Sequence, residues 1–159
     1  MTTAYPADSS TATVEDSPSS FRYRALEDWP TLPLNLDLVE VPAVATDSQD
    51  RVYVFNRGEN PVLVFTPEGD FICSWGEDVI RRAHGITIGP DDAVYCVDDL
   101  DHTVKKFSTD GELLLTLGIS GCFSDTGATS VDYREIRRAG PPFNFPTNLA
   151  ISPSGDLYV

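Results

Sequence analysis

Two residues in this chain have types and positions that could do chemistry, His84 and Arg57. His84 lies in the segment Arg82-Ala83-His84-Gly85-Ile86, directly before an apolar run. Neutral imidazole is a common zinc ligand, and one histidine can be one of several ligands brought together from different parts of a fold. The glycine beside it permits close approach of another backbone. A lone histidine before a strand is more commonly structural, so spacing alone leaves both roles open.

Arg57 follows an apolar run in the segment Val54-Phe55-Asn56-Arg57-Gly58. Its planar guanidinium could hold a carboxylate through two parallel hydrogen bonds, which is the chemistry that an acidic substrate needs. The alternative is a loop arginine that pairs with Glu59 or with an aspartate.

The other polar candidates are expected to be structural. His102 is expected to begin a strand in the outer half of its repeat, and Asp98 and Asp99 are expected to cap a turn rather than bind metal. The sequence has no Ser/His/Asp arrangement and no glycine-rich phosphate-binding loop. Cys73 and Cys96 lie in apolar strand patterns and are expected to be buried thiols.

The elements that must position these residues form a repeat. Residues 44–76 read VATDSQDRVYVFNRGENPVLVFTPEGDFICSWG, and residues 86–118 read ITIGPDDAVYCVDDLDHTVKKFSTDGELLLTLG. Tyr53 and Tyr95 are 42 residues apart, and Phe65 and Phe107 keep that offset. Short β-branched runs between turn residues predict antiparallel strands rather than helices. Four strands in a unit of about 40 to 45 residues are typical of a β-propeller blade.

The sequence therefore predicts an all-β fold, a β-propeller with about two and a half blades present. The first blade is expected over residues 42–76, the second over 84–118, and a partial blade over 145–159. Two and a half blades leave sheet edges open and cannot close a ring, which favours a fragment of a longer protein over assembly with another copy. Strands are expected near residues 43–47, 51–56, 61–66, 71–75, 85–89, 93–98, 102–107 and 112–117.

Three further segments lie outside the blades. Residues 1–20 are rich in Ser, Thr, Pro and Asp and are expected to be a disordered tail. Residues 21–41 are expected to be a packed N-terminal segment, with a short strand near 36–41. Residues 119–143 form an insertion between the second and third units, expected to be a surface loop or a functional lid. Its basic residues raise the alternative of a rim that meets an anionic group; they are Arg134, Arg137 and Arg138.

The net charge of −14 argues against a nucleic-acid partner, because phosphate binding needs clustered Lys and Arg. The N-terminal residues lack the basic and apolar regions of a secretory signal, and no apolar run is long enough to span a membrane. The expected partner is thus a small-molecule or peptide substrate, with no nucleic acid and no membrane. The localisation is unknown from these features and is cytoplasmic by default.

Five segments together carry a family resemblance. They are VxVFNRG, FxPEGxFxxSWG, HGITIGPD, DHTVKKFSTDGELLLTLG and PTNLAISPSGDLYV. This pattern resembles the NHL-repeat six-bladed propellers, and within them the peptidyl-α-hydroxyglycine α-amidating lyases and their bacterial relatives. The likeness covers roughly residues 38–159. It implies a lyase with zinc and calcium that cleaves a peptide ending in α-hydroxyglycine into a peptide amide and glyoxylate.

The resemblance also implies roles for particular residues. His84 matches a zinc-binding histidine, and Arg57 matches the active-site arginine. Val44 and Ile86 match the positions whose backbone carbonyls bind calcium. The tyrosine base, the other two zinc histidines and the calcium aspartate would follow Val159, so the chain alone is expected to be inactive and to need the remainder of the propeller.

Two other interpretations stay open. The first is an NHL-repeat interaction scaffold without catalysis, in which case His84 and Arg57 are incidental. A lactonase-type metal propeller is less favoured, because its acidic metal ligands have no clear counterpart in this sequence.

Overall fold

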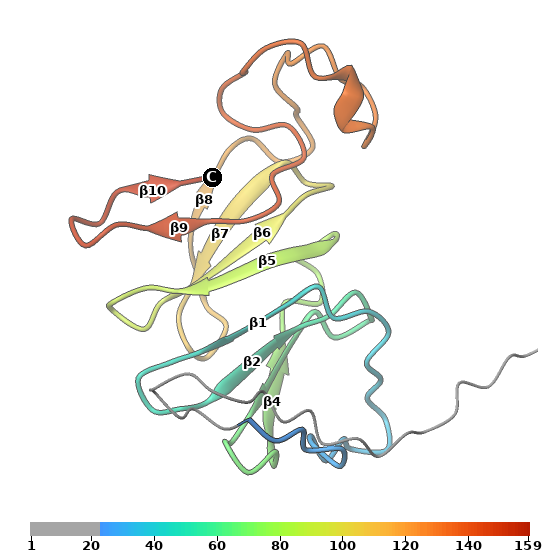
Figure 1. The fold of residues 1–159 in the computed structure, drawn as a ribbon, viewed down its shortest axis with the longest axis vertical. Helices are drawn as coiled ribbons and strands as arrows, with labels where there is room; N and C mark the ends of the chain where they lie inside the picture. Colours follow the sequence, from blue (N-terminus) through green and yellow to red (C-terminus); the bar gives the residue numbers. More distant parts are fainter. Residues whose placement is uncertain (1–22) are drawn as a thin grey trace, which may run out of the picture.

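The structure is a computed structural model that describes residues 23–159. The tail predicted over residues 1–20 lies outside the described residues. Consecutive strands form two four-stranded antiparallel sheets, in the orders β1-β2-β3-β4 and β5-β6-β7-β8, followed by a two-stranded sheet of β9 and β10 (Figure 1). The first sheet contains β1 (Ala43–Thr46), β2 (Val52–Phe55), β3 (Val62–Phe65) and β4 (Phe71–Trp75). The second contains β5 (Ala83–Ile88), β6 (Val94–Asp98), β7 (Thr103–Phe107) and β8 (Leu113–Leu117).

The two sheets are propeller blades, and the predicted strands agree with the observed ones to within about two residues. In each blade the chain meanders outward from an inner edge strand, so β1 and β5 lie next to each other at the inner edges. Five residues join β1 to β2, β3 to β4 and the equivalent strands of the second blade; the first and last of the five are linked by a backbone hydrogen bond, which leaves a three-residue loop. Each loop ends in a residue with positive φ, which such hairpins require. These residues are Asp50 (60°), Gly69 (95°), Asp92 (58°) and Gly111 (87°).

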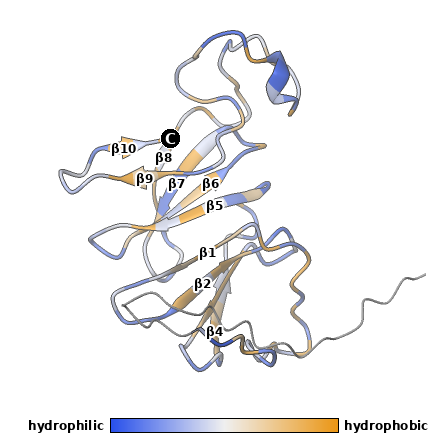
Figure 2. Ribbon diagram, viewed as in Figure 1, coloured by the Kyte–Doolittle hydropathy of each residue, from blue (hydrophilic) through white to orange (hydrophobic). Residues whose placement is uncertain are grey.

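The main hydrophobic core lies between the two blades. Strand interiors are hydrophobic and the connecting loops are hydrophilic (Figure 2). Because each blade buries one face against its neighbour, neither sheet has a complete core of its own. The buried side chains of this core are Tyr53, Phe55, Val62, Val64, Trp75, Ile80, Ala83, Ile86, Val94, Cys96 and Phe107.

The third unit begins as predicted and covers the far face of the second blade. It consists of β9 (Ala150–Ile151) and β10 (Leu157–Tyr158), joined by a turn with Gly155 at φ 90°. Leu149 is buried in a second core cluster with Val97 and Val104. The Thr87 hydroxyl donates to the Leu149 carbonyl at 2.9 Å, which ties β5 to this unit.

The N-terminal segment packs on the first blade, but the strand predicted near residues 36–41 is absent from the structure of that segment. The reason is that a buried side chain, not a neighbouring strand, binds its backbone. The Asn56 side chain accepts from the Val39 N–H at 3.0 Å and donates to the Asp37 carbonyl at 3.0 Å. The segment therefore adopts an irregular conformation that is held by hydrogen bonds to the Asn56 side chain.

Trp29 packs on the first blade in the same way as Trp75 packs on the second. Trp75, at the end of β4, packs over Gly111 and lies 4.9 Å from the Phe107 ring centroid. Trp29 packs over Gly69 and lies 5.7 Å from the Phe65 centroid. Because Gly69 and Gly111, like the two phenylalanines, are one repeat apart, Trp29 occupies the place that a tryptophan of a preceding blade would take. The N-terminal segment thus caps the free face of the first blade.

Along residues 23–159, the structure contains no helix with the length and apolar character that crossing a bilayer requires.

We expect Trp29→Ala to lower the free energy of unfolding by about 2 kcal/mol, because it exposes Phe65 and opens a cavity over Gly69. Leu34→Ala is the matched control, since Leu34 lies in the same segment and is fully exposed. Urea denaturation measures both. Equal midpoints for the two variants would contradict the capping role.

Candidate functional site

The sequence suggested that His84 precedes its strand, but the structure places it inside β5. Ala83 pairs with Asp98 and Gly85 pairs with Val97, so His84 is the extra residue of a β-bulge. A bulge re-aims one side chain out of the sheet's alternation, and such features are enriched beside active sites. His84 is half-buried and lines a cavity of about 350 Å³.

Gly85 permits close approach of a backbone, as predicted, and the backbone comes from the third unit. A Cβ atom at Gly85 would lie 2.6 Å from the Thr147 carbonyl oxygen and 3.0 Å from the Asn148 Cα. The equivalent position in the first blade is Ala43. The glycine therefore lets the chain that enters β9 pass directly beside His84.

Arg57 reaches from the first blade to the second. Its Nε donates to the Ala83 carbonyl at 3.0 Å, so its guanidinium lies one residue from His84. Its Nη1 forms an ion pair with Glu40 at 2.7 Å, and its own N–H donates to the Glu40 carbonyl at 2.9 Å. The acidic partner is thus Glu40 rather than Glu59 or an aspartate.

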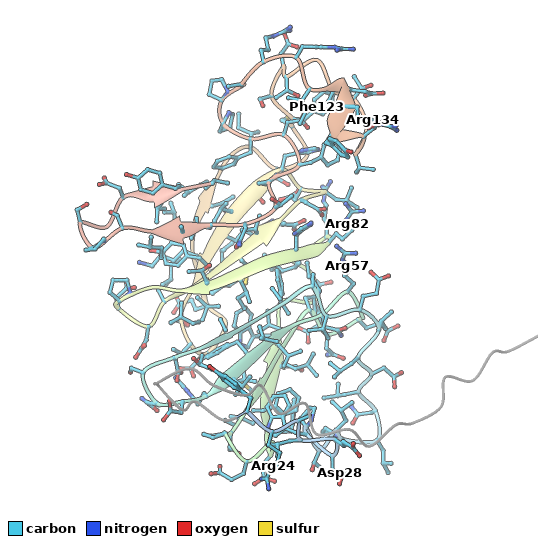
Figure 3. All side chains as sticks on the ribbon, viewed as in Figure 1. Arg24, Asp28, Arg57, Arg82, Phe123 and Arg134 are labelled. Atoms are coloured by element: carbon cyan, nitrogen blue, oxygen red, sulfur yellow. The ribbon has the colours of Figure 1, made fainter. Side chains whose placement is uncertain are left out.

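A second arginine, Arg82, lies beside Arg57 on the same edge of the molecule (Figure 3). It forms a two-point ion pair with Asp99, one bond of which joins Arg82 Nε to Asp99 Oδ1 at 2.7 Å. This pairing raises the pKa of Arg82 above its usual value, because the hydrogen bond to Asp99 outweighs burial. Asp99 is therefore engaged by an arginine and does not cap the turn.

Asp98 does cap the turn, as predicted, and it also holds the backbone that precedes His84. Its buried carboxylate accepts the N–H groups of Arg81 at 2.7 Å, Arg82 at 3.1 Å and Asp101 at 3.1 Å. It also accepts from Lys105 Nζ at 3.0 Å. The two residues before the bulge are thus fixed by one carboxylate.

Lys105 is a buried cation that the sequence analysis did not single out. Its ammonium donates to Asp98, to Asp101 at 2.6 Å and to Thr103 at 2.8 Å. Burial alone would raise the pKa of Asp101, but hydrogen bonds from Lys105 and Ser120 outweigh it and hold the pKa at about 2. The signal in the sequence was a lysine within a strand that follows the acidic turn VDDLD.

The insertion forms a folded arch over this edge, with a short 3₁₀ helix η1 (Tyr133–Glu135) (Figure 1). Its two arms are joined where the Thr126 carbonyl accepts from the N–H of Arg137 at 2.8 Å, and where the Ser124 N–H donates to the Phe143 carbonyl at 2.9 Å. Its residues Ala128, Val131, Tyr133 and Ile136 line the same cavity as His84.

The basic rim considered for the insertion is largely neutralised within the insertion itself. Arg134 forms an ion pair with Asp132 at 2.7 Å, and Arg138 forms one with Asp125. Two of the three arginines are therefore neutralised within the insertion, and Arg137 forms no ion pair with the described residues.

Val44 and Ile86 both direct their carbonyl groups toward the inner edges of their sheets. The Asp47 N–H donates to the Arg51 carbonyl, and the Gly89 N–H to the Ala93 carbonyl, so these are hydrogen-bonded pairs. Hydrogen-bonded and non-hydrogen-bonded pairs alternate along an antiparallel ladder. The registers Val44↔Val54 and Ile86↔Cys96 are therefore non-hydrogen-bonded, and their carbonyls point away from the partner strand.

His102 is structural, as predicted, although it lies in the turn before β7 with φ 56°. Its Nδ1 accepts from the Phe145 N–H at 3.1 Å, and its ring contacts Phe145 edge-on at 4.6 Å between centroids. Burial lowers the pKa of His102, against the raising effect of Asp101, Asp99 and Asp98, and Arg81 lowers it further. His102 thus holds the end of the insertion as a neutral acceptor.

A complete metal site is not formed by the part of the chain that the structure describes. Within residues 23–159 no three His, Cys, Asp or Glu side chains converge as metal ligands would. His84 offers one imidazole, which is a fraction of a zinc site. The thiols give no alternative, since Cys96 is buried, Cys73 is half-buried and Cys122 is exposed and distant in sequence.

Two antiparallel blades with a 42-residue repeat and a third unit in register define a β-propeller chain. The comparisons agree with this class. The chain is 32% identical over 126 residues to human NHL repeat-containing protein 3, covering 73% of this chain and 33% of that protein. It is 27% identical to peptidyl-alpha-hydroxyglycine alpha-amidating lyase 1 of Drosophila melanogaster, covering 82% of this chain and 26% of that protein. The resemblance to NHL-repeat propellers and amidating lyases is confirmed.

Among solved structures, virginiamycin B lyase from Staphylococcus aureus aligns at 17% identity with a TM-score of 0.49, covering 72% of this chain and 32% of that one. No family model matches the chain. The chain spans about a third or less of the length of the curated relatives named above.

We expect Gly85→Ala to loosen the third unit, because the new methyl group would clash with the Thr147 carbonyl. The free energy of unfolding should fall by about 1–3 kcal/mol. Amide exchange of residues 147–151 should become faster. Ala43→Ser, which adds one atom at the equivalent position of the first blade, is the control. Unchanged amide exchange of residues 147–151 in Gly85→Ala would show that the close approach of Thr147 to Gly85 does not stabilise the third unit.

We also expect the attachment of residue 145 to weaken in acid. The pKa of His102 is lower in the folded chain than its ordinary value of 6.5, so protons favour the unfolded form. This contribution to stability is present above pH 6.5 and is lost as the pH falls through the lowered pKa. The readout is the protection factor of the Phe145 amide at pH 7.5 and 5.5, which is the observed exchange rate corrected for the intrinsic rate at each pH. His102→Asn keeps a residue that tolerates positive φ and should remove the pH dependence; a dependence that persists would assign it to another group.

Proposed function

We propose that this chain contributes part of the active site of a zinc-dependent lyase of the amidating-lyase kind, which releases glyoxylate and an amide from an α-hydroxyglycine-type substrate. The observation that carries the proposal is the hydrogen bond from Arg57 Nε to the Ala83 carbonyl, which holds a guanidinium from one blade against the backbone of the residue that precedes His84 in the next.

His84 would be one zinc ligand. The β-bulge turns its side chain into a cavity, and Asp98 fixes the preceding backbone, so the imidazole is held on a rigid element. Zinc, when bound, would polarise the substrate oxygens as a Lewis acid. The other ligands would come from further blades, in the same or in another polypeptide.

Arg57 would bind the carboxylate of the α-hydroxyglycine. Its present partner, Glu40, has a side chain that is 63% exposed. Exposed ion pairs contribute little to stability, so a substrate carboxylate can replace Glu40 at small cost. The Nε–Ala83 hydrogen bond would keep the guanidinium in position during this exchange.

The reaction breaks the bond between the amide nitrogen and the carbinol carbon. The hydroxyl loses a proton and becomes the aldehyde of glyoxylate, while the leaving nitrogen gains a proton and becomes the primary amide. A base is needed for the hydroxyl proton, and a positive guanidinium nearby favours a tyrosinate in that role by lowering its pKa. By resemblance, that tyrosine would lie beyond Val159.

Calcium would bind between the inner edges of the blades. The carbonyls of Val44 and Ile86 point there, and carbonyl oxygens are ligands that calcium prefers. The two inner strands lie next to each other, so a cation between them would fix the distance between Arg57 on one blade and His84 on the other.

An NHL-repeat interaction scaffold is the second candidate. It is favoured by the identity of 32% to a protein named only for its NHL repeats, and by the single imidazole that the described residues offer to a metal. On this alternative, Arg57 and Arg82 would only brace the two blades.

The test is glyoxylate release from an N-acylated α-hydroxyglycine by the complete propeller, with zinc present and after chelation. We expect His84→Ala to reduce turnover at least a hundredfold and to lower the zinc content, with an unchanged unfolding midpoint. Lys106→Gln, in an exposed ion pair with Asp91, is the control. Full turnover in His84→Ala would remove His84 from the mechanism, and absence of turnover in the unaltered protein would favour the scaffold.

A further inference from the structure

The cavity beside His84 has two chemically different sides. One side is polar and comes from the second blade and the start of the third unit, with Arg82, His84, Asp99 and Thr147. The other side comes from the insertion and is mostly apolar, with Ala128, Val131, Tyr133 and Ile136, and from Phe145; Ser130, Asp132 and Asn144 are its polar members. A cavity of about 350 Å³ lies within the range of small-ligand sites, which are commonly apolar with a few polar groups that fix orientation.

The apolar side is exposed although the insertion that carries it is well folded. Val131 is 63% exposed, Tyr133 is 77% exposed and Ile136 is 53% exposed. The 3₁₀ helix that carries Tyr133 is capped by Asp132, whose side chain accepts the Arg134 N–H at 3.1 Å. Glu135 in turn accepts from the Ser130 hydroxyl at 3.2 Å. Exposed apolar side chains that are held in place in this way are typical of a binding surface.

The part of the cavity lining formed by Asn144 and Phe145, its floor, is also rigid. Phe145, a bulky residue, has φ 52°, a conformation that only surrounding contacts can maintain. His102 supplies them, through the hydrogen bond from the Phe145 N–H and the edge-on ring contact. Asn144 joins the floor to the arch, because its amide donates to Thr126 at 2.6 Å and to the Ala128 carbonyl at 3.0 Å.

We propose that the insertion is a specificity wall: Val131, Tyr133 and Ile136 bind the apolar group of a small ligand whose polar end lies on His84 and its neighbours. The inference rests on the proposed function for the identity of the polar end. For an α-hydroxyglycine-type substrate, the apolar group is the large acyl group or side chain that directly precedes the hydroxyglycine. The wall then selects for hydrophobic over charged groups at that position.

Charge on the insertion is consistent with this selection. Arg134 and Arg138 are paired with Asp132 and Asp125, and Arg137 does not line the cavity, so this side of the cavity presents no unpaired cation to an acidic group. Arg82 is paired with Asp99. A charged side chain entering here would lose water without gaining a partner.

The experiment compares two ligands that share a glycine carboxylate and cannot be cleaved, phenylacetylglycine and acetylglycine. Titration of the same complete propeller that the lyase test uses, followed by NMR, gives the two dissociation constants. We expect phenylacetylglycine to bind roughly tenfold more tightly. The double variant Tyr133→Ser, Ile136→Ser should remove that preference. Ile119→Ser is the matched control, since Ile119 lies in the same insertion, is 64% exposed and does not line the cavity.

Equal affinities for the two ligands, no binding of either, or a preference that survives in the double variant would each overturn the proposal. The result is separable from the lyase test, because neither ligand carries the reacting hydroxyl. Preference for phenylacetylglycine in a protein that releases no glyoxylate would retain the wall and reject the lyase. Glyoxylate release with no preference would do the reverse.

Discussion

One buried carboxylate, that of Asp98, fixes the geometry on which the candidate site depends. It binds the backbone of Arg81 and Arg82, the turn at Asp101 and the ammonium of Lys105. A buried charge is tolerated only where it is paired and hydrogen-bonded. Here every partner belongs to the second blade or to the linker that leads into it. The same carboxylate therefore sets the path of the linker between blades, the start of the bulge and the position of the arginine that pairs with Asp99.

The site is consequently built from interactions between units rather than within one. Arg57 crosses from the first blade to Ala83, Gly85 admits the backbone of the third unit, and His102 holds Phe145. In a repeat protein each unit contacts only its neighbours, so a site at the junction of three units inherits the rigidity of all of them. A reactive group placed here needs no flexible loop to bring it to its partners.

The sequence was enough to predict the blades, because strand periodicity and turn residues act over a few positions and recur every 42 residues. It also indicated that Gly85 permits close approach of a backbone, and the structure places the third unit there. The bulge at His84 could not be predicted, since the register shift depends on the pairing of Ala83 with Asp98. Lys105 was missed because a buried lysine depends on carboxylates that the turn brings to it. The predicted strand near residues 36–41 was wrong because Asn56, a distant side chain, binds that backbone.

The cap formed by Trp29 has a consequence for how tightly the first blade is sealed. The cap is covalently joined to β1, and only a few residues separate Val39, which is bound by Asn56, from Ala43 at the start of β1. Docking of the cap is therefore intramolecular, at an effective concentration near the millimolar range. A contact too weak to hold two separate molecules together is then sufficient. Because the segment is tethered, a second copy of the chain that placed its own Trp29 over Phe65 and Gly69 would form a dimer by exchange of N-terminal segments.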